Sequence, residues 1–254
     1  MSETRSPLST RALATTPRLY VEQPLAVGAR VVLPTPASHY LASVMRMAVG
    51  DSLRVFDDIG GEFHAQIADA ARKAVAIDIV ALLHPREPVA DIWLCLAPIK
   101  RGRIDLVAEK ACELGAAKLL PVITARTIVD KLNLDRLRAN MIEAAEQCGR
   151  TALPELAKPV ALAKLLKDWP AERALLFADE EGGAPLTADL CHAPAAILIG
   201  PEGGFTPAER DTIRAHPQAV AISLGPRILR AETAAIAALA VWQALAPTLR
   251  TRQD

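Results

Sequence analysis

Residues 195–209, with the sequence AAILIGPEGGFTPAE, combine a run of small apolar residues, a glycine-rich turn and the start of a helix. An apolar run without polar alternation is typical of a strand that is buried on both faces of a parallel sheet. Thr206 and Glu209 have the spacing of a capping box, and Pro207 takes the first helical position. The segment therefore predicts a buried strand, a tight turn and a helix, which together form the repeating unit of an α/β domain.

The same alternation continues on both sides of this segment. Apolar runs predict further strands at residues 91–99, 118–124, 173–179 and 219–225, and helical spacing predicts helices at residues 104–115, 134–149 and 232–246. Strands that alternate with helices indicate a mostly parallel sheet, and the ligands of such sheets bind at the carboxyl ends of the strands.

The first third of the chain has a different pattern. Short β-like runs at residues 27–34, 51–58 and 62–69 surround one helical stretch at residues 38–47. Short strands with closely spaced turn residues indicate a small barrel or a curled sheet. Pro85 and Pro88 mark a linker. We therefore expect a disordered extension at residues 1–16, a barrel at residues 17–84 and an α/β domain at residues 89–250.

Composition narrows the class of protein. The chain has 254 residues, of which 51% are hydrophobic, and its formal net charge is zero. It contains no run of the roughly 18 to 20 apolar residues that span a membrane, and the first sixteen residues lack the apolar core of a secretory signal. The four cysteines lie far apart without a CxxC pattern, so we expect reduced thiols and no metal site. These features indicate a soluble cytoplasmic protein that does not bind membranes.

Two loops follow predicted buried strands and have the composition of ligand-binding loops. They are residues 200–206, GPEGGFT, and residues 224–233, LGPRILRAET. Glycine allows the backbone to approach a ligand closely, whereas the spacing of dinucleotide and phosphate loops is absent. The two loops together suit an uncharged ligand that is recognised by the backbone, such as an adenine nucleoside.

Basic residues are concentrated in residues 98–138, which hold nine Lys or Arg against five acidic residues. A solvated helix face explains most of this segment, although a local basic patch also suits docking on a phosphate backbone. For Arg101 and Arg103, solvated positions are favoured over contacts with RNA.

LIGPEGGFTPAE at residues 198–209, followed by SLGPRILRAETAA at residues 223–235, resembles the paired signature of the bacterial small-subunit ribosomal RNA methyltransferase family E of the SPOUT superfamily. Residues 100–127 and 142–156 resemble two further segments of this family, and the first third resembles its PUA-like RNA-binding barrel. The resemblance extends from about Pro17 to Ala246. Its departures include Met45, where the family has Leu, and Leu137, where Trp is common.

The resemblance implies an S-adenosylmethionine-dependent enzyme of ribosome biogenesis that methylates N3 of a uridine in 16S ribosomal RNA, either free or in the assembled small subunit. It also implies a trefoil knot in the α/β domain and a homodimer with the active site near the subunit interface. By position, it places around the cofactor Phe177, Ala178, Gly200, Pro201, Glu202, Gly203, Gly204, Leu224, Gly225, Ile228, Leu229 and Thr233.

The chemistry of the reaction points to cationic side chains. Uracil N3 must lose its proton before it can act as a nucleophile, so the site needs a base or cations that stabilise the developing charge. Arg230 is the first candidate for stabilising that charge; its other possible roles are to pair with Glu232 or to bind the cofactor carboxylate. Weaker candidates, which a partner subunit could supply, are Arg126, Glu146, Gln147 and Arg150.

Two other functions stay open at this point. One is another SPOUT RNA methyltransferase that acts on the ribose 2′-oxygen, although such enzymes carry a Ser-Leu-Asn-Val-Ser type of final motif and this chain has SLGPR at residues 223–227. The other is a non-catalytic RNA-binding factor of ribosome assembly.

Overall fold

The computed structural model describes residues 15–129 and 131–246. The chain divides into two compact units, the first made of Met1–Pro88 with Gly149–Ala152 and the second of Val89–Cys148 with Leu153–Asp254. All but the last two residues of the extension expected at residues 1–16 lie outside the described residues, as do residues 247–250 of the expected α/β domain.

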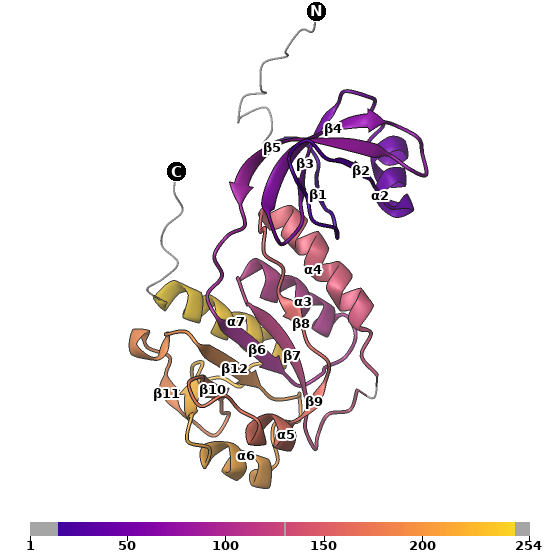
Figure 1. Ribbon diagram of the computed structural model, residues 1–254. Coiled ribbons are helices and arrows are strands. Elements are labelled where there is room, and N and C mark those ends of the chain that lie inside the picture. The colour runs from indigo at the N-terminus through magenta and orange to yellow at the C-terminus, as the bar shows by residue number, and fades with distance from the viewer. Residues whose placement is uncertain (1–14, 130, 247–254) are drawn as a thin grey trace, which may run out of the picture. The chain divides into compact units, whose positions relative to one another are not determined.

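The first unit is built on a five-stranded sheet with the order β1-β3-β4-β5-β2 (Figure 1). The strands are β1 (Arg18–Tyr20), β2 (Arg30–Val32), β3 (Ser52–Phe56), β4 (Gly61–Asp69) and β5 (Ala76–Pro85). Apolar side chains on one face form its core, with Leu41, Leu53 and Ile77 fully buried. Closure of this sheet into a barrel stays a prediction, because no strand pair joins β1 to β2 among the described residues.

The helical segment expected at residues 38–47 begins and ends three residues earlier, at residues 35–44. It consists of α2 (Thr35–His39) followed by one π-helical turn, η1 (Tyr40–Val44). Arg46 then adopts a left-handed conformation with φ 55°, and the N–H of Met47 donates to the carbonyl of Leu41. A left-handed residue closed by such a bond ends a helix, so the helical segment ends at Val44, three residues before the end of the expected range.

The second unit has the predicted α/β architecture. Its parallel strands follow the order β11-β13-β10-β12-β6-β7-β8, and β9 pairs with β7. They are β6 (Ile92–Leu96), β7 (Lys118–Ile123), β8 (Glu155–Leu156), β9 (Val160–Ala161), β10 (Ala174–Ala178), β11 (Ala184–Pro185), β12 (Ala195–Ile199) and β13 (Ala219–Ser223). Every residue of β12 is buried, as its unbroken apolar sequence predicts.

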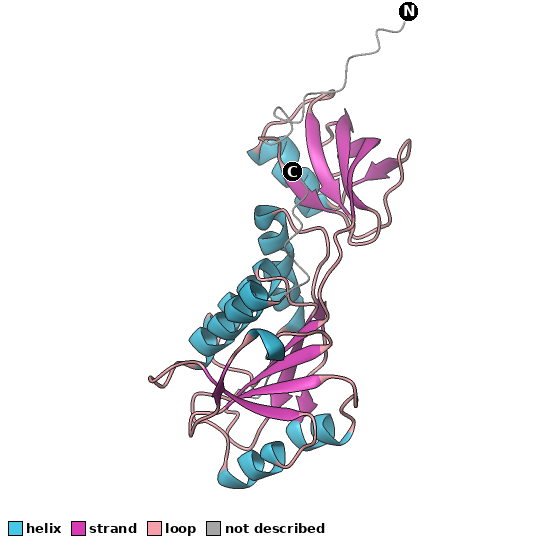
Figure 2. Cartoon of the chain, turned by 90° about the vertical axis from the view of Figure 1, so that its left-hand side faces the viewer, coloured by secondary structure: helices cyan, strands magenta, loops and turns pink. Residues whose placement is uncertain are grey.

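Helices cover both faces of this sheet (Figure 2). One face carries α3 (Arg103–Glu113), α4 (Leu134–Cys148) and α7 (Ala231–Leu245), and the other carries α5 (Leu162–Lys167) and α6 (Pro207–Arg214). A short 3-10 turn, η2, spans Ala188–Leu190. Alternate residues of the strands face opposite layers; for example, Leu198 of β12 belongs to the same buried cluster as Leu165 of α5 and Ile213 of α6.

No helix within the described residues is long and apolar enough to cross a membrane. In the same part of the chain, no group of three His, Cys, Asp or Glu side chains is placed to hold a metal ion.

Candidate functional site

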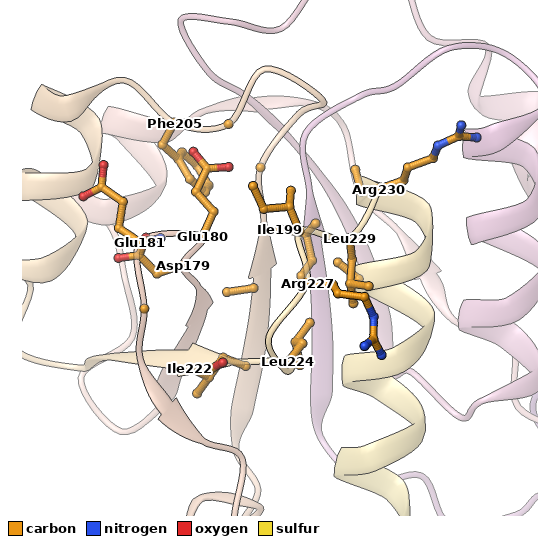
Figure 3. A pocket seen from close by; sticks show the side chains of 18 of the residues that line it. Asp179, Glu180, Glu181, Ile199, Phe205, Ile222, Leu224, Arg227, Leu229 and Arg230 are labelled. Carbon is orange, nitrogen blue, oxygen red and sulfur yellow. The ribbon is translucent and has the colours of Figure 1, made fainter.

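The carboxyl ends of β10, β12 and β13 meet around one pocket of about 470 Å³ (Figure 3). Three loops form its walls: residues 179–182 after β10, residues 200–205 after β12 and residues 224–230 after β13. Pockets of several hundred Å³ hold small-molecule ligands and cofactors. The pocket therefore lies where the parallel topology predicts a ligand site.

Gly204 and Gly225 are two of the glycines in these loops whose conformations other residues rarely adopt. Gly204 has φ +68°, and a Cβ atom there would lie 2.3 Å from a carboxylate oxygen of Glu180. Gly225 has φ +113°, and a Cβ atom there would meet no heavy atom within 4 Å. The first glycine lets two loops pack together, and the second sits beside open space at the pocket wall.

Nine of the twelve residues expected around a cofactor line this pocket. These nine are Ala178, Gly200, Pro201, Glu202, Gly204, Leu224, Gly225, Ile228 and Leu229.

The other three lie elsewhere. Phe177 is buried in the core, where its ring packs edge-on against Phe205 with 5.3 Å between centroids. Gly203 is exposed, and a Cβ atom there would face the side chain of Arg126 at 3.5 Å. Thr233 is exposed on α7 and does not line the pocket.

The acidic wall of the pocket went unnoticed in the sequence. Arg210 of α6 is buried and contacts three consecutive acids, with its Nη2 2.9 Å from Glu180 and its Nη1 2.5 Å from Glu181. The third acid, Asp179, is fully buried and also binds Arg214, with 2.5 Å between Nη2 and Oδ2. The sequence signal that could have indicated this wall is the run of three acids that directly follows the buried strand β10. Because two arginines neutralise most of its charge, this wall is ordered and only weakly anionic.

Arg126 binds the loop at residues 200–205 through its backbone carbonyls. Its Nη1 donates to the carbonyl of Gly203 at 2.7 Å and to that of Phe205 at 3.3 Å. It does not line the pocket. This geometry supports a positioning role for Arg126 in place of the catalytic role considered from the sequence.

The start of α6 fixes the other end of the same loop. Thr206 Oγ1 accepts the N–H of Glu209, and Glu209 Oε2 accepts the N–H of Thr206 at 2.9 Å, which confirms the predicted capping box. The second oxygen of Glu209 accepts the N–H of Ala125 at 2.7 Å. Burial acts to raise the pKa of Glu209, but the N–H groups of Thr206 and Ala125 outweigh it and hold the pKa below its ordinary value.

Replacing Glu209 with glutamine is expected to lower the free energy of unfolding by about 1 to 2 kcal/mol at pH 7, because charge-assisted hydrogen bonds are lost. Because the pKa of Glu209 is lowered in the folded state, its stabilisation is fully present above the ordinary value of 4.5 and is lost as the pH falls through the lowered value. The difference from the unmodified protein should therefore shrink in acid. Denaturant unfolding at pH 7 and pH 4 measures it, with Glu143→Gln at an exposed position of α4 as control; a pH-independent difference would show that the carboxylate charge is irrelevant.

Arg103 joins the two glycine loops. Its Nη1 lies 3.5 Å from Glu202 Oε1, and its Nε lies 3.5 Å from Glu232 Oε1. Its side chain is 37% exposed and forms two ion pairs, so Arg103 is partly solvated and also bound to the protein. Arg103 therefore pairs with Oε1 of Glu232, whereas the buried Oε2 of Glu232 has no hydrogen-bond partner within the described chain, and no ion pair joins Glu232 to Arg230 there.

Arg230 is the N-cap residue of α7 and lines the pocket. Its side chain is exposed and forms no ion pair with the part of the chain that the structure describes. Figure 3 shows it extending away from Ile199 and Leu229, on the opposite side of the pocket from Asp179, Glu180 and Glu181. The guanidinium is thus available to a ligand that approaches from that side.

Glu146 and Arg150 do not line the pocket. Glu146 is half-buried on α4. Arg150 is buried in the first unit, where its Nε lies 3.9 Å from Glu87 Oε1 and its carbonyl accepts from Arg18 Nη2 at 2.8 Å. Nothing in this geometry gives either residue access to the pocket of its own chain.

Comparison with known proteins identifies two matching families. The family described as RNA methyltransferase domain matches residues 85–243, and the one described as RNA methyltransferase PUA domain matches residues 33–80. Ribosomal RNA small subunit methyltransferase E of Rickettsia conorii is 33% identical over 229 residues, which cover 88% of this chain and 93% of that protein. The protein of the same name from Synechocystis is 34% identical, with 90% and 77% covered.

Two solved structures share the fold over most of their length. A methyltransferase from Legionella pneumophila in complex with the bound cofactor SAM is 33% identical, with a TM-score of 0.81, covering 91% of this chain and 98% of that one. Ribosomal RNA small subunit methyltransferase E from Neisseria gonorrhoeae, bound to S-adenosyl methionine, is 30% identical, with a TM-score of 0.82 and the same coverage.

Proposed function

The chain belongs to the ribosomal RNA small subunit methyltransferase E family, and we propose that it transfers a methyl group from S-adenosylmethionine to N3 of a uridine in small-subunit ribosomal RNA. The observation that carries this proposal is the convergence of the two signature loops, residues 200–206 and 224–233, on one pocket at the carboxyl ends of β12 and β13.

The residues present fit S-adenosylmethionine. Apolar side chains suited to a flat base line the pocket, among them Ile199, Ile222 and Leu224. Gly225 leaves open space at the wall, so backbone can approach a ligand there. The backbone N–H groups of Ile228 and Leu229 form no hydrogen bond within the described chain and can donate to an adenine or a ribose. When bound there, S-adenosylmethionine supplies the methyl group from its sulfonium.

The protein's own part in the reaction is positioning and charge stabilisation. Arg126 and Arg103 hold the loop at residues 200–206 in place, which fixes the geometry in which the reacting atoms meet. As uracil N3 loses its proton to solvent water, negative charge spreads to the uracil oxygens. Arg230, which has a permanent positive charge and no ion pair within the described residues, stabilises that charge.

The family resemblance supports three further parts of the proposal. The second unit forms a trefoil knot, the chain acts as a homodimer in the cytoplasm, and the first unit, whose residues 33–80 match the PUA family, docks on RNA. A dimer would also give Glu146 and Arg150 their only route to a catalytic role, since neither lines the pocket of its own chain.

Two measurements separate this proposal from a non-catalytic assembly factor. Calorimetric titration should show binding of S-adenosylmethionine, and a labelled methyl group should pass from it to small-subunit ribosomal RNA. Binding of RNA without methyl transfer, to either free RNA or assembled subunits, would favour the assembly factor.

A further inference from the structure

The turn between β6 and α3 carries two adjacent exposed cations, Lys100 and Arg101. Gly102 follows with φ +85°, and its N–H donates to Asp105 Oδ2 at 3.2 Å, so the turn is fixed at the start of α3. The carbonyl of Lys100 accepts from the N–H groups of Arg103 and Ile104. The two cations therefore project from an ordered turn.

Arg103 places this turn beside the entrance of the pocket. It contacts both Glu202 and Glu232 at 3.5 Å, and Glu232 lies two residues after Arg230. The residues before Arg103 thus neighbour the first turn of α7, on the side of the pocket where Figure 3 shows Arg227 and Arg230.

Ion pairing divides the cations around the pocket into two groups. Arg103, Arg126, Arg210 and Arg214 bind acids or carbonyls of the protein. Lys100, Arg101, Arg227 and Arg230, which we call the cationic rim, are all exposed and form no ion pair within the described chain. Four unneutralised positive charges on a chain of zero net charge make a local field that attracts a polyanion.

We propose that Lys100, Arg101 and Arg227 of the cationic rim bind phosphates of the RNA backbone next to the target nucleotide, with Lys100 and Arg101 as positioning residues for the substrate, while Arg230 serves the target uracil itself. This inference rests on the proposed function, because it takes the pocket to be the site of methyl transfer. Phosphate contacts fix the register of a nucleic acid without reading its sequence, and methyl transfer needs that register.

The test is RNA binding by the full chain carrying Lys100→Ala and Arg101→Ala together. Affinity for a transcript of small-subunit ribosomal RNA is measured between 50 and 200 mM salt. Loss of two phosphate contacts should reduce the slope of log affinity against log salt by roughly 1.4 to 1.8 and weaken binding roughly 10-fold. Affinity for S-adenosylmethionine should not change, since neither residue lines the pocket.

Two further variants keep the result interpretable. Lys158→Ala with Lys167→Ala removes two exposed charges of the second unit outside the rim and should leave the salt slope unaltered. Lys100→Arg with Arg101→Lys keeps both charges and should retain most of the affinity. If this swap weakens binding as much as alanine does, the shape of the turn matters and the phosphate proposal is wrong.

Two other outcomes would contradict the phosphate proposal. An unchanged affinity and slope in the double alanine variant would overturn the proposal, as would weaker binding to assembled subunits with normal binding to free RNA, which would indicate a protein contact. The test measures RNA binding and not turnover. A wrong prediction for the rim would therefore leave the proposal of methyl transfer to uridine intact, and a wrong proposal of methyl transfer would leave the binding result for the rim intact.

Discussion

Replacing Arg230 with alanine should lower turnover about 100-fold at saturating S-adenosylmethionine and RNA, while the affinity for S-adenosylmethionine changes little. Deleting one donor that stabilises developing charge typically has an effect of this size. The structure strengthens this expectation, because Glu232 pairs with Arg103 and Arg230 forms no ion pair within the described chain. A group that acts mainly in the transition state affects kcat more than ground-state binding.

Arg227→Ala is the matched control for Arg230→Ala. It removes the same charge from the same loop, and Arg227 also lines the pocket and is exposed. As a phosphate-binding residue it should raise the KM for RNA and leave kcat much less affected. Near-normal kcat in Arg230→Ala would refute the catalytic role, and a loss of S-adenosylmethionine affinity as large as the loss of turnover would make Arg230 a cofactor ligand.

Gly225→Val should weaken binding of S-adenosylmethionine by on the order of 100-fold, which corresponds to about 2.7 kcal/mol. Gly225 has φ +113°, and a Cβ atom there would meet no protein atom within 4 Å. The protein thus leaves room for the side chain, and the loss would come from blocking the approach of the ligand and from straining the loop. Calorimetry measures the affinity directly.

Gly50→Val controls for backbone strain alone. Gly50 has φ +90° and equally open surroundings, but it lies in the first unit and does not line the pocket. Its substitution should lower stability to a similar extent and leave S-adenosylmethionine binding intact. If both variants bind S-adenosylmethionine as tightly as the unmodified protein does, the loop at residues 224–229 is not part of the cofactor site.

The α/β architecture could be predicted because its signals are local and regular. β12 has an unbroken apolar sequence, and the capping box of Thr206 and Glu209 fixes the start of α6. Short or irregular elements gave weaker signals: β8, β9 and β11 have two residues each, and β5 carries bulges in its pairing with β4. The pairing of such strands depends on neighbours that are distant in the sequence.

The pocket loops could be predicted more reliably than the roles of their charged residues. Glycine and apolar residues after buried strands indicate where a ligand lies, and most of them line one pocket. The sequence does not reveal which group an arginine side chain binds. The hydrogen bonds of Arg126 to two carbonyls and the ion pairs of Arg103 with two acids depend on tertiary structure and could not be predicted. The ion pairs of the acids at residues 179–181 likewise could not be predicted, because their partner Arg210 lies in α6, about thirty residues further along the chain.

The most direct test of the central claim is the identity of the methylated nucleoside. The unmodified protein is incubated with S-adenosylmethionine carrying a labelled methyl group and with small-subunit ribosomal RNA, both free and in assembled subunits, and the RNA is digested to nucleosides for mass spectrometry. Our account predicts labelled 3-methyluridine, which should be absent when the Gly225→Val protein is used at low cofactor concentration. A label on the ribose 2′-oxygen or on another base would contradict it.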